Sequence, residues 1–158
     1  MATTSNATRA AGDRELTINR LFKAPRDLVF RAWTEEEHLA HWPGPKGFTA
    51  TPDKFDCRTG GFFRTCLHAP DGGDHWVQGT YLEVSPPERL VFTHAWEDGS
   101  GRPGPQTVVT VTLREEAGQT RMHFHQALFE SRASRDGHEG GWNESFDRLA
   151  AWLAEAQS

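Results

Sequence analysis

The stretch GWNESFDRLAAWL, residues 141–153, decides the fold class of this chain. Its large apolar side chains recur at positions i, i+4, i+7 and i+11, namely at Trp142, Phe146, Leu149 and Leu153. This spacing places them in one stripe along an α-helix, with polar residues on the opposite side. The stretch therefore predicts a long C-terminal helix whose single apolar face must pack against another element.

The residues before this helix have the pattern of short strands separated by turn residues. Alternation and turn signals predict strands at residues 15–22, 48–56, 62–68, 76–84, 89–96, 107–114 and 120–129. A sheet accompanied by one long helix buries its apolar face against the apolar stripe of that helix. The order of elements therefore predicts an α+β domain, with an antiparallel sheet of about seven strands around the C-terminal helix.

Two short helices are predicted between the first and second strands. Pro25 suits the first position of a helix, whose apolar face is formed by Leu28, Val29, Ala32 and Trp33. Thr34 and Glu37 have the spacing of a capping box, which predicts a second short helix from Glu35. The sequence Pro43-Gly44-Pro45 is expected to end it.

Length and charge narrow the class of protein. The 158 residues make one domain, and we expect residues 1–12 to be a disordered tail before a single domain at 13–158. A net charge of −5 argues against nucleic acid as a partner, because sequence-independent binding to it needs a basic surface. No apolar run approaches the ~20 residues of a membrane span. No secretory signal is visible either, which favours a cytoplasmic location.

The two cysteines are predicted to be reduced thiols. A hairpin turning at Gly60-Gly61 would place Cys57 near Arg64 and Cys66 near Phe55, so the two are not directly opposed. Unpaired thiols agree with the predicted cytoplasmic location.

A series of motifs then resembles a known family, the homologues of the activator of the heat-shock-protein-90 ATPase. The opening signature is FKAPRDLVFRAWT at 22–34, followed by LAHW at 39–42 and GPKGF at 44–48. DCRTGG at 56–61, YLEV at 81–84 and PERLVFT at 87–93 continue it through the predicted sheet, and Gly141-Trp142 and Leu149 continue it in the last helix. The resemblance covers roughly residues 15–155.

This resemblance implies the START-like (SRPBCC) helix-grip fold, in which a bent sheet grips a C-terminal helix around a deep cavity. It implies binding of hydrophobic ligands and raises a chaperone as a partner. One departure concerns the ligand. Where the family often has two adjacent tryptophans, this chain has Trp42-Pro43, and the rigid proline is expected to alter the mouth of the cavity.

The predicted cavity has apolar walls and few polar groups. Alternation places Leu90, Phe92, His94 and Trp96 on one face of their strand, and Met122, Phe124, Gln126 and Leu128 on one face of another. The candidate ligand-binding residues are Trp33, Trp42, Phe92, His94, Trp96, Phe124, Gln126, Trp142 and Phe146. His94 and Gln126 would orient the ligand. From the residues alone, a solid aromatic core is the alternative, whereas the resemblance favours the cavity.

Several glycines allow two interpretations. Gly137, Gly140 and Gly141 either leave an opening between helix and sheet or mark a delayed start of the helix.

Two pairs of histidines are candidates for a metal site. His123 and His125 point to one side of their strand, as in some zinc sites, but that side is predicted to face solvent and no third ligand is evident. His38 and His41 are spaced for a shared ion but fit solvated residues better. We predict no metal and no cofactor.

Catalytic motifs are missing from the sequence. It has no nucleophile elbow, no phosphate-binding glycine loop and no metalloprotease helix motif. We therefore predict no catalytic residue, although His94 is a candidate general base, with Glu83 a much weaker candidate.

The sequence leaves three hypotheses for the function. The first is a binding domain for a hydrophobic or aromatic small molecule, lipid-like or polyketide-like. The second is an interaction module for a chaperone or regulatory protein. The third is a cyclase- or hydrolase-like enzyme using His94.

Overall fold

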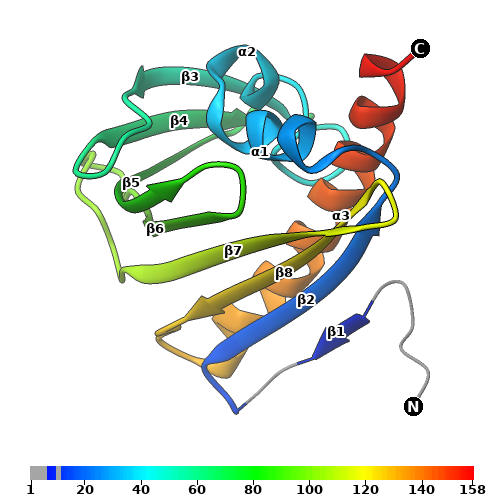
Figure 1. Cartoon of the computed structure of the whole chain (residues 1–158). Coiled ribbons are helices and arrows are strands. Elements are labelled where there is room, and N and C mark those ends of the chain that lie inside the picture. Colours follow the sequence, from blue (N-terminus) through cyan, green and yellow to red (C-terminus); the bar gives the residue numbers. More distant parts are fainter. Residues whose placement is uncertain (1–6, 10–11) are drawn as a thin grey trace.

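The computed structural model describes residues 7–9 and 12–158 and contains one antiparallel sheet around one long helix (Figure 1). The strands are β1 (Ala7–Arg9), β2 (Glu15–Phe22), β3 (Thr49–Phe55), β4 (Phe62–His68), β5 (Asp74–Ser85), β6 (Arg89–Trp96), β7 (Thr107–Glu116) and β8 (Gln119–Ala127). The helices are α1 (Arg26–Thr34), α2 (Glu36–Leu39) and α3 (Arg132–Ala156). The predicted α+β helix-grip fold is confirmed.

The sheet order is β1-β2-β8-β7-β6-β5-β4-β3, so all strands from β3 to β8 follow one another as hairpins. Among the described strands, the only neighbours that are not consecutive in the chain are β2 and β8, because the chain passes from β2 through α1 and α2 to β3 at the other end of the sheet. The sheet has one strand more than predicted, because Ala7–Arg9 pairs with β2. These three residues belong to the segment predicted as a tail. Residues 1–6 and 10–11 of that segment lie outside the described residues.

The hairpin between β3 and β4 has another register than the one predicted. Cys66 is opposite Thr51 and Phe55 is opposite Phe63, with an irregularity between Pro52 and Lys54. The reason is that the chain around Gly60 forms a wider loop than a two-residue turn, with Gly60 N–H donating to the carbonyl of Tyr81 on β5. Cys57 and Cys66 are free thiols.

The ends of the helices differ from the prediction in three places. Pro25 is the N-cap of α1 rather than its first residue. The predicted capping box is wrong, because the Thr34 hydroxyl donates to the carbonyl of Phe30 in the preceding turn, and Glu35 caps α2 without a side-chain bond. α3 begins earlier than the glycines suggested, because the Ser131 hydroxyl accepts from the N–H of Ser134 and caps the helix there.

The core lies where α1 and α3 meet the concave side of β2, β6, β7 and β8. Leu16, Ile18, Val109, Met122 and Phe124 from the sheet are fully buried, as are Phe146 and Leu149 of the predicted helix stripe. Leu128 was expected on the same inner face but is 65% exposed, because β8 ends at Ala127 and Leu128 adopts a positive φ of 73°. Phe129 turns inward in its place. No helix in the described part of the chain has the length and apolarity needed to cross a membrane.

Candidate ligand-binding cavity

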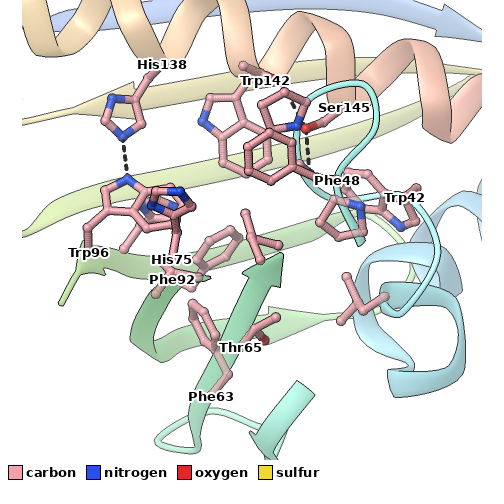
Figure 2. Close-up of a pocket in the computed structure, with 18 of the residues that line it drawn as sticks. Trp42, Phe48, Phe63, Thr65, His75, Phe92, Trp96, His138, Trp142 and Ser145 are labelled. Carbon is pink, nitrogen blue, oxygen red and sulfur yellow. Dashed lines mark hydrogen bonds between the residues drawn. The ribbon is translucent and has the colours of Figure 1, made fainter. Parts of the chain in front are cut away.

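A cavity of about 480 Å³ lies between α3 and the curled end of the sheet formed by β3, β4, β5 and β6. It is lined by Trp33, Leu39, Trp42, Pro43, Gly44, Pro45, Phe48, Pro52, Phe55, Phe63, Thr65, Leu67, His75, Val77, Tyr81, Phe92, His94, Trp96, Ala133, Ser134, Gly137, His138, Gly141, Trp142 and Ser145. Figure 2 shows His138, Trp142 and Ser145 descending from α3 toward Phe63, Thr65 and Phe92 on the strands below.

The sheet wall follows from the period of two along each strand. Phe63, Thr65 and Leu67 of β4 point into the cavity, whereas Cys66 between them points to the outer face with Arg64 and His68. Gly79 on β5 makes room for this wall. A Cβ at Gly79 would lie 2.6 Å from a ring carbon of Phe63 and would clash with the carbonyl of Thr93, so the Phe63 ring can pack here only against a glycine.

The helix wall is formed by small residues. Ala133, Gly137, Gly141 and Ser145 recur every four residues of α3, which places them on one face of the helix turned to the cavity. A Cβ at Gly137 would meet nothing within 4 Å, and one at Gly141 would meet only Pro45 at 3.9 Å. Of the two interpretations, the opening between helix and sheet therefore holds for Gly137 and Gly141, and the delayed helix start is wrong because α3 begins at Arg132.

The third wall is the segment from Trp42 to Phe48, which α3 holds in place. The N–H of Gly44 donates to the Ser145 hydroxyl at 2.9 Å, and the guanidinium of Arg148 donates to the carbonyls of Pro43, Gly44 and Pro45 at 3.0–3.2 Å. The Trp42 indole N–H donates to the carbonyl of Ala32 at 3.0 Å, which fixes its ring. Pro43 lies in the lining itself, as expected from its place in the sequence.

Three polar rings of the cavity lie together at the end formed by β6 and the first turns of α3. The Trp96 indole N–H donates to Nε2 of His138 at 2.9 Å, so the proton of this imidazole is on Nδ1, which donates to the carbonyl of Ser134 at 2.7 Å. The ring of His94 lies 5.9 Å from that of His138 and 5.8 Å from that of Trp142. Burial, together with the nearby His138, lowers the pKa of His94 to about 3, so this ring is a neutral hydrogen-bonding group at pH 7.

The nine predicted ligand-binding residues divide into two groups. Trp33, Trp42, Phe92, His94, Trp96 and Trp142 line the cavity. Phe124, Gln126 and Phe146 do not, because they are fully buried behind the rings of Trp33 and Trp142. Gln126 has a different part from the one predicted. Its carbonyl oxygen accepts from the Trp142 indole at 2.7 Å, and its amide donates to the Thr107 hydroxyl at 2.9 Å, so it orients a wall residue rather than a ligand.

Trp33 connects the cavity to the core. Its ring centroid lies 4.9 Å from that of Trp42, 6.0 Å from that of Trp142 and 6.2 Å from that of Phe92. Within the described residues, Trp33 Nε1 is the one buried side-chain nitrogen or oxygen without a hydrogen-bond partner. This nitrogen is an N–H with no acceptor, which costs stability unless an acceptor is supplied.

Sequence reasoning missed the wall formed by β3, β4 and β5, including Phe55, Phe63, Val77 and Tyr81. The alternation of Phe63, Thr65 and Leu67 was a usable signal, because it places these three residues on one face. No sequence pattern indicated that His138 accepts a hydrogen bond in the cavity, since its partner Trp96 is 42 residues away in the chain.

The remaining candidates lie outside this cavity. His123 is exposed and His125 contacts Glu15 at 3.0 Å, so both are on the outer face of β8, as predicted. His38 is half-buried and accepts from the Trp152 indole at 2.9 Å, so it is not the solvated residue predicted. His41 is exposed, as predicted, and stacks on the same ring. Glu83 accepts from Ser85 and Arg89 and is not in the lining.

Comparison with known proteins places this architecture in a family. The family model described as "Activator of Hsp90 ATPase homolog 1-like protein" matches residues 23–154. The chain belongs to this family. The resemblance seen in the sequence motifs is therefore confirmed. No curated protein matches the chain.

Solved structures agree with this assignment. The crystal structure of the AHSA1 protein from Silicibacter pomeroyi is 26% identical, covers 90% of this chain and 99% of that one, and gives a TM-score of 0.82. A protein from Chromobacterium violaceum is also 26% identical, with 90% and 98% covered and a TM-score of 0.83. A solution structure from Arthrobacter aurescens is 25% identical, with 96% and 93% covered and a TM-score of 0.88.

Proposed function

We propose that this AHSA1-like chain is a non-enzymatic binding domain for an uncharged, mainly apolar small molecule, lipid-like or aromatic and polyketide-like. The observation that carries the proposal is the cavity between α3 and β3–β6, whose volume of about 480 Å³ falls in the range of ligand pockets. Its walls are largely aromatic and aliphatic, so burial of apolar ligand surface would supply the affinity, at about 25 cal/mol per Å² before ordering costs.

The polar groups of the lining narrow the class of ligand. Among the described residues that line the cavity, none is Asp, Glu, Lys or Arg. An ionised ligand would lose its hydration there without gaining an opposite charge, so a neutral one is favoured. His94, neutral and next to Trp96, can exchange one hydrogen bond with a hydroxyl or carbonyl of the ligand.

The six tryptophans give the test an internal control. Trp33, Trp42, Trp96 and Trp142 line the cavity, whereas Trp76 and Trp152 do not. In a heteronuclear NMR screen with pooled lipids, flavonoids and aromatic polyketides, a true ligand will shift the indole signals of Trp96 and Trp142 in a saturable titration. The signals of Trp76 and Trp152 will stay in place. Silence throughout the screen, or equal shifts at Trp76, would contradict the proposal.

The two alternatives remain predictions. An interaction module for a chaperone or regulatory protein needs a continuous apolar surface. Of the large hydrophobic side chains exposed in the described residues, Phe62 and Leu82 lie on the paired strands β4 and β5, whereas Leu128 follows β8, away from both. An enzyme using His94 as general base would have to work with an imidazole of low basicity, because burial lowers the pKa of His94 to about 3.

A further inference from the structure

The outer face of the sheet, away from the cavity, carries a cluster of three side chains with metal-binding atoms. Cys66 and His68 alternate on β4, and Asp74 begins β5 directly opposite His68. The thiol, imidazole and carboxylate donor atoms all lie within 4.8 Å of one another. Strand pairing fixes this convergence, because the backbones of β4 and β5 are hydrogen-bonded at these positions.

The distances fit one small ion. Cys66 Sγ lies 3.7 Å from His68 Nδ1. When a sulfur and a nitrogen both bind one tetrahedral zinc ion at the usual bond lengths, the sulfur and the nitrogen are about 3.6 Å apart. Asp74 Oδ1 lies 2.8 Å from the same Nδ1. That carboxylate must therefore move back by roughly half an ångström to become a ligand itself. Its side chain is 56% exposed and has room to do so.

A second residue holds the imidazole from its other side. Thr51 Oγ1, on β3, lies 2.9 Å from His68 Nε2. A hydroxyl can donate or accept, so Thr51 Oγ1 can accept a hydrogen bond from Nε2–H when the single proton of the neutral imidazole is on Nε2 and the Nδ1 lone pair binds a metal. Metal-binding histidines have such a partner on the other ring nitrogen as a rule, and it sets the orientation of the ring.

We propose that Cys66, His68 and Asp74 bind a zinc ion, with a water molecule as the fourth ligand and Thr51 as the positioning residue for His68. A thiolate, an imidazole and a carboxylate are the donor set that favours zinc over magnesium or calcium, which prefer oxygen alone. The ion ties β4 to the start of β5 on the face opposite the cavity, so this site is independent of ligand binding.

The untagged full chain, titrated with cobalt(II) as a spectroscopic substitute for zinc, tests the proposal. We expect a thiolate-to-cobalt absorption band that saturates at one equivalent and disappears when zinc is added. Cys66→Ser will abolish the band, and Cys57→Ser, the matched control at the other cysteine, will keep it. Thr51→Val will weaken binding about 10- to 100-fold.

Cys66 is fully buried, so a second variant guards against a folding defect. The side chain of His68 is 38% exposed, and His68→Gln will keep a dispersed NMR spectrum while cobalt affinity falls at least about tenfold. Zinc will also raise the thermal midpoint of the wild type but not that of His68→Gln. Absence of the band in the wild type, its survival in Cys66→Ser, or unchanged affinity in His68→Gln would overturn the proposal.

Discussion

Burial keeps the His94 ring uncharged at neutral pH and makes it a source of acid sensitivity. The pKa of His94 falls to about 3 in the folded protein because the ring is desolvated, from an ordinary value of 6.5. Between these two values the unfolded chain binds a proton that the folded chain does not. The free energy of unfolding therefore falls as the pH drops from about 6.5 toward 3. Above pH 6.5 both states leave His94 neutral, and the ring causes no loss of stability.

Replacing His94 by Gln should remove this dependence. From the two pKa values, the His94 contribution decreases by about 2 kcal/mol between pH 7 and pH 5. Urea unfolding at both pH values should therefore show a loss about 2 kcal/mol larger in the wild type than in His94→Gln. The titrating groups other than His138, which interacts with His94, are common to the two proteins and cancel in the difference. Parallel pH profiles would mean that the ring is hydrated and can become charged.

Gln126 illustrates a polar residue that acts through a neighbour. It accepts from the Trp142 indole and donates to Thr107, whose hydroxyl in turn donates to the carbonyl of His94 at 2.9 Å. Gln126→Leu would leave the half-buried Trp142 N–H and the buried Thr107 hydroxyl without this partner and should cost about 1–3 kcal/mol in urea unfolding. Gln119→Leu, at the half-buried start of the same strand, is the control and should change stability by less than about 0.5 kcal/mol. Equal effects would contradict this account of Gln126.

At the scale of elements, α3 has an unusual composition for a helix that closes a cavity. Gly137 and Gly141 each weaken the helix by about 1 kcal/mol relative to alanine. The space they leave is taken by the cavity on one face of α3. Gly140 lies outside the lining, and a Cβ there would also meet nothing within 4 Å. The helix therefore offers two glycines that differ chiefly in the direction they face.

Substitutions at Gly137 and Gly140 distinguish an effect on helix stability from an effect on ligand binding. Gly137→Leu and Gly140→Leu should both raise the thermal midpoint, because each replaces glycine by a strong helix former in open space. Only Gly137→Leu places a side chain in the cavity, so it should weaken binding of a ligand from the NMR screen at least about tenfold, while Gly140→Leu leaves the dissociation constant unchanged. Similar losses in both variants would locate the ligand elsewhere.

The same elements show where local signals are sufficient. The stripe of α3 predicted its buried face, because Phe146, Leu149 and Leu153 share one side whatever they pack against. The capping box at Thr34 was wrong, because the hydroxyl found a carbonyl in its own helix at 2.8 Å. The Thr34 hydroxyl could bond either to the carbonyl of Phe30 or to the N–H of Glu37, and the sequence does not show which of the two is within reach.

At the scale of the whole molecule, the sequence predicted the helix-grip architecture but not the boundary between core and cavity. Phe92 and Phe124 lie on the inner faces of their strands, and alternation treats them alike. One lines the cavity and the other is fully buried, because β6 belongs to the curled end of the sheet and β8 to the end covered by α3. Contacts such as Gly44 to Ser145 set this boundary, and they join residues 101 positions apart.

Xenon under pressure tests the central claim, a cavity that accepts an apolar guest, without requiring the natural ligand. Xenon enters apolar cavities and perturbs nearby methyl signals. We predict saturable shifts at Leu67 and Val77, which line the cavity, and unchanged signals at Val109 and Leu153, which are buried in the core. Equal shifts at all four residues, or none at Leu67 and Val77, would contradict the account and leave a domain with a filled interior.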